Sequence, residues 1–270
     1  MRSHPKKIFL AIKGFGDFFI LANFLRNARS KKNIHLIASR RFEDWAKLLI
    51  PEIKTHWVAF DGFPAFYDLK RLRFKDLVVD LKILLTIRSI IKNKDATLYL
   101  DFKNIKNRCL FVNIKKAYIA NQGNLYLGFT KLFHSQKIKP LKPQPNFINI
   151  FPKGSYAAKV ISKTNLNLIC DSLMQAKIKV RVVLHPSEVT YYPNIEDKLI
   201  KTYQNAGELK SLMSDCDAIL TTDTSSLHLA ILLGKPFFVW GPYDKGMLPV
   251  YVDQRCLVKN LNELSKLTSY

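Results

Sequence analysis

The chain has 270 residues, of which 48% are hydrophobic, so it can bury the core of one large domain or of two modest ones. Its 43 lysine and arginine residues outnumber its 21 acidic residues, and we find no uninterrupted apolar run of about 18 residues that would predict a membrane-spanning helix. The four cysteines lie far apart in the sequence, which argues against a zinc knuckle or a disulfide framework and favours a reducing, cytoplasmic setting.

The positive charge is concentrated in the first half of the chain. Residues 1–145 hold 29 basic and 10 acidic residues, a net charge of 29 − 10 = +19, whereas the remainder carries 14 − 11 = +3. Such asymmetry predicts a polyanionic partner for the first half: a phosphorylated glycolipid, an anionic membrane surface or nucleic acid. A charge that serves only solubility is the alternative.

The first half reads as alternating strands and helices. A basic start followed by the short apolar run FLAI predicts a strand and not a signal peptide. A glycine turn, GFGD, then leads into a helical pattern, as at the start of a Rossmann-type unit. In chain order we expect strands at 6–12, 33–39 and 75–81 and helices at 18–30 and 42–50. Asp80 would fall near the carboxyl end of the third strand.

A proline-rich segment separates the two halves. Residues 134–147 contain Pro140, Pro143 and Pro145, which forbid regular structure and favour an extended connector. We therefore predict two domains, 1–143 and 144–270.

The same alternation restarts after the connector. We expect strands at 147–151, 179–185, 217–222 and 235–241, and helices at 163–176, 195–205, 207–215 and 225–234. The fold class is therefore α/β, with two Rossmann-like domains whose parallel sheets are covered by helices and whose carboxyl ends face a shared cleft.

The most informative motif is TTDTSSLHLAILLGKPFFVWGPYD, residues 221–244. A strand delivers the chain to Asp223, and Thr224 and Ser225 then open a helix, so that free backbone amides and hydroxyls converge where an anion can bind. His228 follows on the same face of the first turn. Ordinary capping by Asp223 or Thr224, with His228 packed against a strand, is the structural alternative.

This motif resembles the donor-site signature of the heptosyltransferase family, Asp-[Ser/Thr]-Gly-x-x-His followed by a strand and Gly-Pro-Thr-Asp. The resemblance implies a GT-B glycosyltransferase in which Asp223, Thr224, Ser225 and His228 bind the nucleotide-sugar. Ser225 departs from the family, which usually has glycine there. The serine side chain limits how closely the phosphate can approach the backbone at this position.

The N-terminal strand and turn resemble the family's strand, glycine, aspartate and helix, in which the aspartate is the general base. The resemblance assigns that role to Asp17. A positioned carboxylate that takes the proton of a weakly nucleophilic hydroxyl contributes about 10²- to 10⁴-fold to a rate. From the residues alone, a cap for the following helix is the other interpretation.

Two further segments resemble the family in the right order. The segment 75–102 implies that Asp80, Lys82, Arg88 and the loop 103–108 lie near the acceptor; a solvated face is the alternative for Lys82 and Arg88. The segment INIFPKGSYAAKVIS implies that Ser155 and Lys159 contact the diphosphate, although Val160–Ser162 replace the family's Arg-Trp-Pro. Glu188 either reaches the donor or is an exposed loop residue.

We expect no catalytic metal and no cofactor. The Asp-x-Asp at Asp215 and Asp217 precedes its strand and so lies at the end opposite to the expected ligand. No Gly-x-x-x-x-Gly-Lys-[Ser/Thr] loop, third glycine of a dinucleotide fingerprint or Gly-x-Ser-x-Gly elbow occurs.

The resemblance predicts an inverting, metal-independent transferase at the inner face of the cytoplasmic membrane. It would move a heptose or related sugar from a nucleotide diphosphate, expected to be ADP-linked, onto an anionic lipid-linked glycan of the lipopolysaccharide type. The alternatives are a catalytically idle relative that acts as an assembly partner, an epimerase of the same architecture, and a nucleic-acid-binding protein suggested only by the charge.

Overall fold

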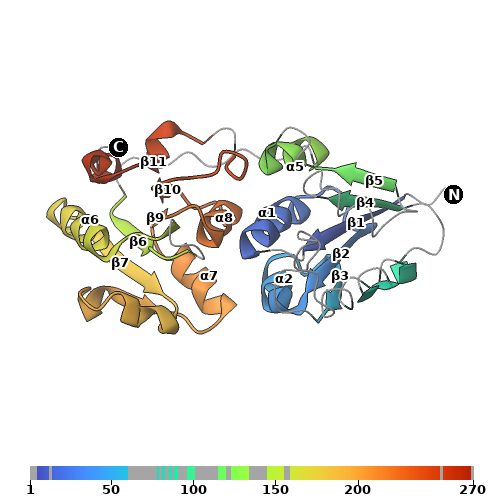
Figure 1. Ribbon diagram of the computed structural model, residues 1–270, viewed down its shortest axis with the longest axis horizontal. Helices are drawn as coiled ribbons and strands as arrows, with labels where there is room; N and C mark the ends of the chain where they lie inside the picture. The colour runs from blue at the N-terminus through green and yellow to red at the C-terminus, as the bar shows by residue number, and fades with distance from the viewer. Residues whose placement is uncertain are drawn as a thin grey trace. The chain divides into compact units, whose positions relative to one another are not determined.

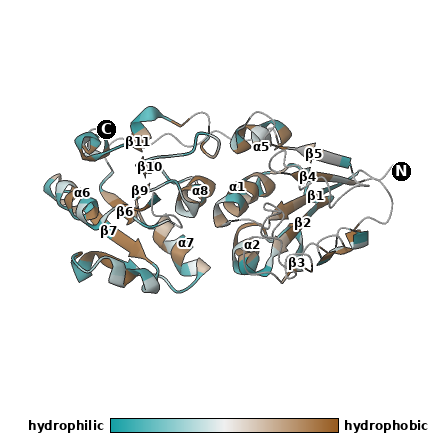
Figure 2. Cartoon of the chain, viewed as in Figure 1, coloured by the Kyte–Doolittle hydropathy of each residue, from teal (hydrophilic) through white to brown (hydrophobic). Residues whose placement is uncertain are grey.

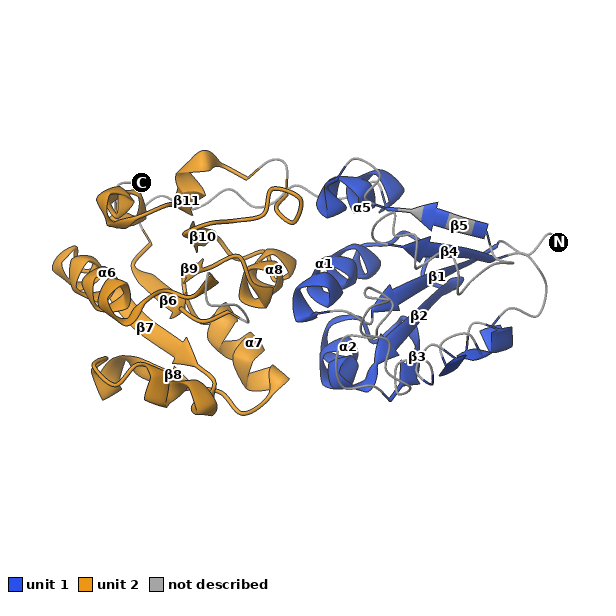
Figure 3. Ribbon diagram, in the orientation of Figure 1, with its two compact units in different colours: residues 1–136 blue, residues 137–270 orange. Residues whose placement is uncertain are grey.

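The computed structural model divides the chain into two compact units, residues 1–136 and 137–270 (Figure 3). The sequence placed the domain boundary at 143/144, within a connector of which residues 134–144 lie outside the described part of the chain. The structure describes residues 5–11, 14–59, 78, 81–82, 85–86, 88–90, 96–100, 115–119, 123–133, 145–154, 159–249 and 252–268.

The first unit is built on a five-stranded sheet (Figure 1). Its strands are β1 (Lys6–Ala11), β2 (Ile34–Ser39), β3 (Lys54–Val58), β4 (Ala96–Leu100) and β5 (Lys115–Tyr118). They lie in the order β3-β2-β1-β4-β5, and every pair is parallel, with Ile8 opposite both His35 and Leu98. The strand order reverses between β1 and β4, which is where ligands bind in open parallel sheets.

Helices α1 (Phe15–Arg26), α2 (Glu43–Leu49) and α5 (Leu125–Phe133), with the short 3₁₀ helix η1 (Arg40–Phe42), accompany this sheet. Residues 18–25 of α1 are all buried, because every one of them except Asn23 is apolar and together they occupy all sides of the helix. Phe24 stacks on Phe129 of α5 at 5.0 Å between ring centroids, and Phe18 stacks on Phe42 at 4.8 Å. Each fully buried phenylalanine contributes about 1.5–3 kcal/mol, so α1 is the main core element of the first unit.

The predicted third strand is wrong. The described residues between 78 and 90 are helical, and the third strand in chain order is β3, which the sequence analysis missed. The composition of a short apolar run does not distinguish a strand from a helix. Here the apolar residues recur with helical spacing over a stretch longer than a typical strand. Asp80 lies outside the described residues.

The second unit is built on a six-stranded sheet of β6 (Phe147–Phe151), β7 (Lys179–Leu184), β8 (Ile200–Thr202), β9 (Ala218–Thr221), β10 (Phe237–Trp240) and β11 (Leu257–Val258). The order is β11-β10-β9-β6-β7-β8, again with every pair parallel. The order reverses between β6 and β9. Figure 2 shows apolar residues along the strands of each sheet, which form the centre of each core.

Helices connect these strands and complete the core of the second unit. They are α6 (Lys163–Gln175), α7 (Ala206–Ser214), α8 (Ser225–Leu232) and α9 (Ser265–Thr268), with the 3₁₀ helices η5 (Pro186–Tyr191), η6 (Asp197–Leu199), η7 (Gln254–Cys256) and η8 (Leu261–Glu263). Helix α8 ends before Gly234, whose φ of 67° suits glycine. The expected strands at 147–151, 179–185, 217–222 and 235–241 and the helices at 163–176, 207–215 and 225–234 are confirmed within a few residues.

The helix expected at 195–205 is wrong, because that stretch forms η6 and the edge strand β8. Three residues of strand are too short to leave an alternating pattern. Among the residues that the structure describes, no helix combines the length and the apolar character needed to cross a bilayer.

Candidate functional site

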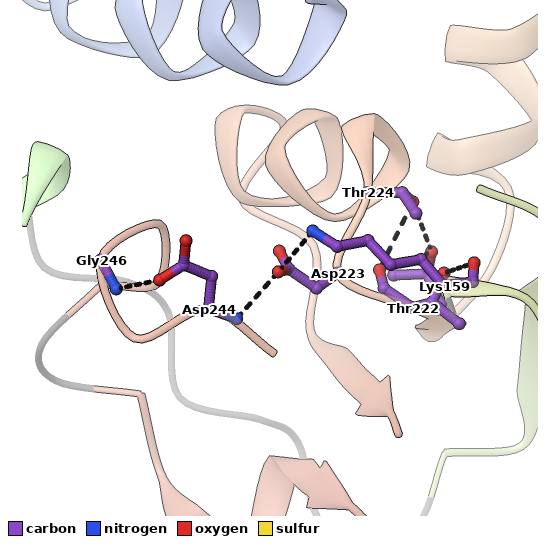
Figure 4. Close-up of polar contacts among 7 residues, drawn as sticks. Lys159, Thr222, Asp223, Thr224, Asp244 and Gly246 are labelled. Atoms are coloured by element: carbon purple, nitrogen blue, oxygen red, sulfur yellow. Dashed lines mark hydrogen bonds and ion pairs between the residues drawn. The ribbon is translucent and has the colours of Figure 1, made fainter. Parts of the chain in front are cut away.

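A buried ion pair joins two segments at the carboxyl end of the second sheet. Asp223 follows β9, and its carboxylate lies 2.9 Å from the Lys159 ammonium. The Asp223 side chain is 1% exposed and that of Lys159 is 32% exposed. The same oxygen, Oδ2, also accepts a hydrogen bond of 2.9 Å from the backbone N–H of Asp244 (Figure 4). Asp223 therefore binds together the loop after β6, the start of α8 and the loop after β10.

Hydrogen bonds from two threonine hydroxyls also stabilise the junction between the loop after β6 and the start of α8. The Thr222 hydroxyl donates a hydrogen bond of 2.8 Å to the Lys159 carbonyl. The Thr224 hydroxyl points back to the Thr222 carbonyl at 3.4 Å and makes no capping bond to the first turn of α8. The first-turn amides of α8 are therefore not satisfied by their N-cap side chain, a state in which a helix start favours an anion.

Gly154 allows the loop after β6 to pass close to α8. A β-carbon at this position would lie 2.4 Å from Cγ2 of Thr224 and 2.6 Å from the Lys159 carbonyl oxygen. Any side chain would therefore push the loop away from the helix start. This role of Gly154 could not be predicted, since nothing in a single sequence shows which glycine lies against a second segment.

An open pocket of about 330 Å³ lies beside this junction, within the second unit. It combines one cation, two hydroxyls at the start of α8, a carboxylate, two aromatic rings and the aliphatic side chain of Val183. The lining residues are Phe151, Lys153, Gly154, Val183, Glu188, Tyr203, Ser225 and Ser226. A pocket with this lining suits a ligand that has an anionic end and a planar or hydroxylated end.

Glu188 and Tyr203 form the polar wall of the pocket. Glu188 Oε2 accepts a hydrogen bond of 2.9 Å from the His185 N–H, so its carboxylate is held by the start of η5. Burial, and secondarily the negative charge of Glu188, raise the pKa of Tyr203 to about 12. Tyr203 is therefore a neutral phenol at pH 7, able to pack against a ring and to donate a hydrogen bond.

His228 is buried behind the ion pair and is 3% exposed. Burial lowers its pKa to about 4; the Asp223 charge opposes this shift and the Lys159 charge adds to it. The imidazole is therefore neutral near pH 7. His228 lies in the first turn of α8, on the same side of the helix as Thr224 and Ser225, as its spacing from them predicted. A direct contact between His228 and a donor stays a prediction.

Asp17 lies in the first turn of α1, immediately after β1 in the first unit. Its Oδ2 accepts a hydrogen bond of 3.3 Å from the Gly14 N–H, and its side chain is half-buried. Asp17 is the third residue of the helix, whose N-cap is Gly14, so the N-cap position that the sequence alone suggested for Asp17 is wrong, and its carboxylate accepts from the N-cap amide instead. The helix begins at Phe15, three residues earlier than expected. Its catalytic role stays a prediction.

The remaining predicted residues divide into two groups. Lys82 and Arg88 are exposed and lie among the described helical residues between 78 and 90 of the first unit. Ser155 and the loop 103–108 lie outside the described residues.

The acidic residues around β9 are structural. Asp215 pairs with Arg181 at 3.1 Å, and Asp217 Oδ2 accepts hydrogen bonds from the amides of Asn146 and Phe147. Both precede β9, as the sequence indicated. Among the residues that are described, no three His, Cys, Asp or Glu side chains gather as a metal site would require.

Comparison of the chain with known proteins gives a likeness of fold. No protein-family model matches the chain, and no curated protein matches its sequence. Among solved structures, the glycosyl transferase family 9 protein from Veillonella parvula DSM 2008 has a TM-score of 0.60 and 13% identity, covering 91% of this chain and 83% of its own. The E. coli ADP-heptose lps heptosyltransferase II has a TM-score of 0.60 and 12% identity, covering 97% and 98%.

A UDP-N-acetylglucosamine 2-epimerase is also similar, with a TM-score of 0.52, 11% identity and coverage of 98% and 85%. Transferases and an epimerase therefore share this architecture, so the fold alone does not choose between the two chemistries. The α/β class with two parallel sheets is confirmed, and the chain has the GT-B fold of the solved heptosyltransferases.

Proposed function

We propose that this chain is a glycosyltransferase that moves a sugar from a nucleoside diphosphate onto an anionic, lipid-linked acceptor. The observation that carries the proposal is the pocket at the carboxyl ends of β6 and β7, where Lys153 and the first residues of α8 offer positive charge, hydroxyls and helix-start amides. A diphosphate needs these groups. The likeness of fold to solved nucleotide-sugar transferases supports the same assignment.

The two ends of the pocket suggest how a donor would lie in it. Ser225, Ser226 and Lys153 would hold the diphosphate, while Tyr203 and Glu188 would receive the nucleoside, with Glu188 accepting hydrogen bonds from ribose hydroxyls. Lys159, together with Ser155, would face the departing phosphate, where negative charge grows in the transition state. Asp223 would keep the Lys159 ammonium in place, since their ion pair already exists in the protein.

In the proposed reaction Asp17 takes the proton from an acceptor hydroxyl. The hydroxyl oxygen forms a bond to the anomeric carbon as the bond from that carbon to the diphosphate breaks, which inverts the configuration. The nucleoside diphosphate leaves with the electron pair of the broken bond. Lys82 and Arg88, both exposed, would bind anionic groups of the acceptor. The proposal includes an ADP-linked heptose or related sugar, a lipopolysaccharide-type acceptor at the inner membrane surface, and no metal or cofactor.

Nucleotide binding tests the pocket directly. We expect Lys153→Met to weaken the binding of a nucleoside diphosphate by about tenfold, because a charge-assisted contact to phosphate is lost. Lys163→Met is the matched control: both ammonium groups lie over the Tyr191 ring, at 5.3 and 5.1 Å, but only Lys153 lines the pocket. Calorimetry with ADP, UDP, GDP and CDP measures both variants. Equal losses in the two variants, or no binding by the wild type, would reject the assignment of the pocket.

Product analysis separates the remaining chemistries. Transfer of sugar to a glycolipid by the wild type, lost in Asp17→Asn while nucleotide binding remains, supports the proposed base. Sugar-nucleotide binding with neither transfer nor donor hydrolysis would indicate the idle relative. A new sugar nucleotide formed from donor alone would indicate an epimerase. Activity that is unchanged in EDTA is expected of a metal-independent enzyme.

A further inference from the structure

The described residues between 78 and 90, namely 78, 81–82, 85–86 and 88–90, are helical and belong to the first unit. The Thr86 hydroxyl donates to the Lys82 carbonyl and the Ser89 hydroxyl to the Thr86 carbonyl, both at 2.8 Å, a pattern typical of Ser and Thr in helices. At its end the Lys6 ammonium donates a hydrogen bond of 2.6 Å to the Ile90 carbonyl, and the Ile90 side chain is 4% exposed. The helix is therefore joined to β1 through its last turn.

One face of this helix presents apolar side chains to the solvent. Val78, Leu81 and Leu85 are 37%, 55% and 53% exposed. Their spacing of three and four residues places them on a single stripe of the helix surface. Among the described residues, seven large hydrophobic side chains are at least 36% exposed, and three of them fall in this short stretch. Such a concentration marks an interaction surface more often than chance exposure does.

Cations flank the apolar stripe. Lys82 follows Val78 by four residues and Arg88 follows Leu85 by three, so each lies beside the stripe on the helix surface, and both side chains are exposed. In the sequence, residues 68–95 hold eight basic residues against four acidic ones, so the stretch is basic on balance. The first unit as a whole carries 26 basic and 10 acidic residues, a net charge of 26 − 10 = +16, against 17 − 11 = +6 for the second.

We propose that this stripe inserts into the surface of an anionic bilayer, with Lys82 and Arg88 among the lipid headgroups. An apolar face bordered by Lys and Arg is the pattern of an interfacial helix: the leucines reach the acyl boundary and the long basic side chains extend to the phosphates. Charge favours a bilayer over a second copy of the chain as the partner. Two first units, each of net charge +16, repel each other, whereas an anionic lipid surface attracts such a unit. This membrane contact rests on the proposed transferase function and specifies which residues of the chain would touch the membrane.

Vesicle sedimentation of the full chain tests the inference. We expect the wild type to bind phosphatidylcholine vesicles that contain phosphatidylglycerol, to bind pure phosphatidylcholine weakly, and to release as salt rises. The double variant Leu81→Gln, Leu85→Gln should bind the anionic vesicles at least about tenfold more weakly, because apolar insertion is removed. Lys82→Gln with Arg88→Gln should reduce the preference for anionic lipid and flatten the salt dependence.

Leu168→Gln provides the matched control, since Leu168 is 44% exposed on α6 of the second unit and should leave vesicle binding unchanged. Equal binding of both vesicle types by the wild type, or full binding by the Leu81 and Leu85 variant, overturns the proposal. So does a lipid-free dimer of the wild type that the double variant abolishes in sedimentation velocity. Nucleotide binding, measured in parallel, separates the two ideas: its loss would reject the transferase, whereas lost vesicle binding alone rejects only this surface.

Discussion

At the scale of single residues, Asp223 illustrates how one carboxylate organises the candidate site. Its side chain is almost wholly buried, and one oxygen serves both the Lys159 ammonium and the Asp244 amide. The sequence analysis assigned Asp223 to donor binding. In the structure its carboxylate contacts Lys159 and Asp244, and its contact with a donor stays a prediction.

We expect Asp223→Asn to lower the free energy of unfolding by about 2–4 kcal/mol, because it leaves the Lys159 cation without its buried counter-ion. The nucleotide affinity should fall as well, since Lys159 and the loop after β10 lose their common anchor. Urea denaturation and calorimetry measure the two effects.

Asp253→Asn is the matched control for that measurement. Asp253 pairs with Arg255 at 2.6 Å, but the two side chains are 44% and 69% exposed, so loss of the pair should change the stability by less than about 1 kcal/mol. Comparable losses in the two variants would show that burial of the Asp223 pair has no particular effect.

At the residue level, the sequence motif indicated which residues lie together, whereas their roles in donor binding stay predictions. Lys159, Asp223, Thr224, Ser225 and His228 do gather at one end of one sheet. Lys153, Gly154 and Tyr203 were missed, because each enters the pocket through the path of a loop or strand end and none belongs to a recognisable string. The position of Tyr203 directly after β8 would have been a signal had that strand been predicted.

At the scale of elements, the loop after β6 is closed by bonds at both ends. The Ile161 N–H donates to the Pro152 carbonyl at 2.8 Å, and the buried Tyr192 hydroxyl lies 3.1 Å from the Ile161 carbonyl and 3.4 Å from that of Pro152. Lys153, Gly154 and Lys159 are all described parts of this loop. The pocket therefore depends on the loop keeping its close approach to α8.

We expect Gly154→Ala to destabilise the protein by about 1–3 kcal/mol and to weaken nucleotide binding, because the added methyl group overlaps Thr224 and the Lys159 carbonyl. Thermal unfolding with and without ADP measures both quantities.

Gly207→Ala tests whether a methyl group on a glycine is harmful in general. The nearest atom to a β-carbon there is Asn205 Oδ1 at 3.3 Å, so the stability should change by less than about 1 kcal/mol in either direction. An effect of Gly154→Ala as small as that of Gly207→Ala would contradict the proposed close approach.

Element prediction failed for specific physical reasons. The segment 75–81 was predicted to be a strand, but a run of valine and leucine fits a helix equally well. Only the apolar residues that continue at helical spacing as far as Ile90 distinguish the two. Helix α5 and strand β5 were not anticipated, and η6 and β8 were taken for one helix. Short edge strands carry too few residues for a pattern, and tertiary pairing with β7 stabilises β8.

At the scale of the whole molecule, each unit contains a buried histidine whose pKa is lowered to about 4. Burial is the main cause for both, with help from His56, Lys6 and Lys54 at His35, and from Lys159 at His228, where Asp223 acts in the opposite direction. His35 also shares a hydrogen bond of 3.1 Å with His56 on the neighbouring strand. The lowered pKa values keep both imidazoles neutral near pH 7.

We expect the stability of the protein to fall as the pH drops from about 6.5 to about 4. In this range the unfolded chain, with histidine pKa values near 6.5, binds more protons than the folded chain, so the free energy of unfolding rises with pH. Each histidine should cost about 1–2 kcal/mol at pH 5 relative to pH 7.5. Urea denaturation at the two pH values checks this.

His228→Gln and His35→Gln should each remove part of the pH dependence and the double variant most of it. A pH dependence that is unchanged in the double variant would assign the acid sensitivity to other groups.

The division of the chain has a consequence for its synthesis. All strands of the first sheet lie within residues 1–136 and all those of the second within 137–270, so the polypeptide passes from one unit to the other once. A growing chain can therefore complete the first sheet on the ribosome before any strand of the second has emerged, and no strand must wait for a partner from the other unit. Synthesis in this order protects the long-range parallel pairings, which are slow to form and prone to aggregation, from competition with each other.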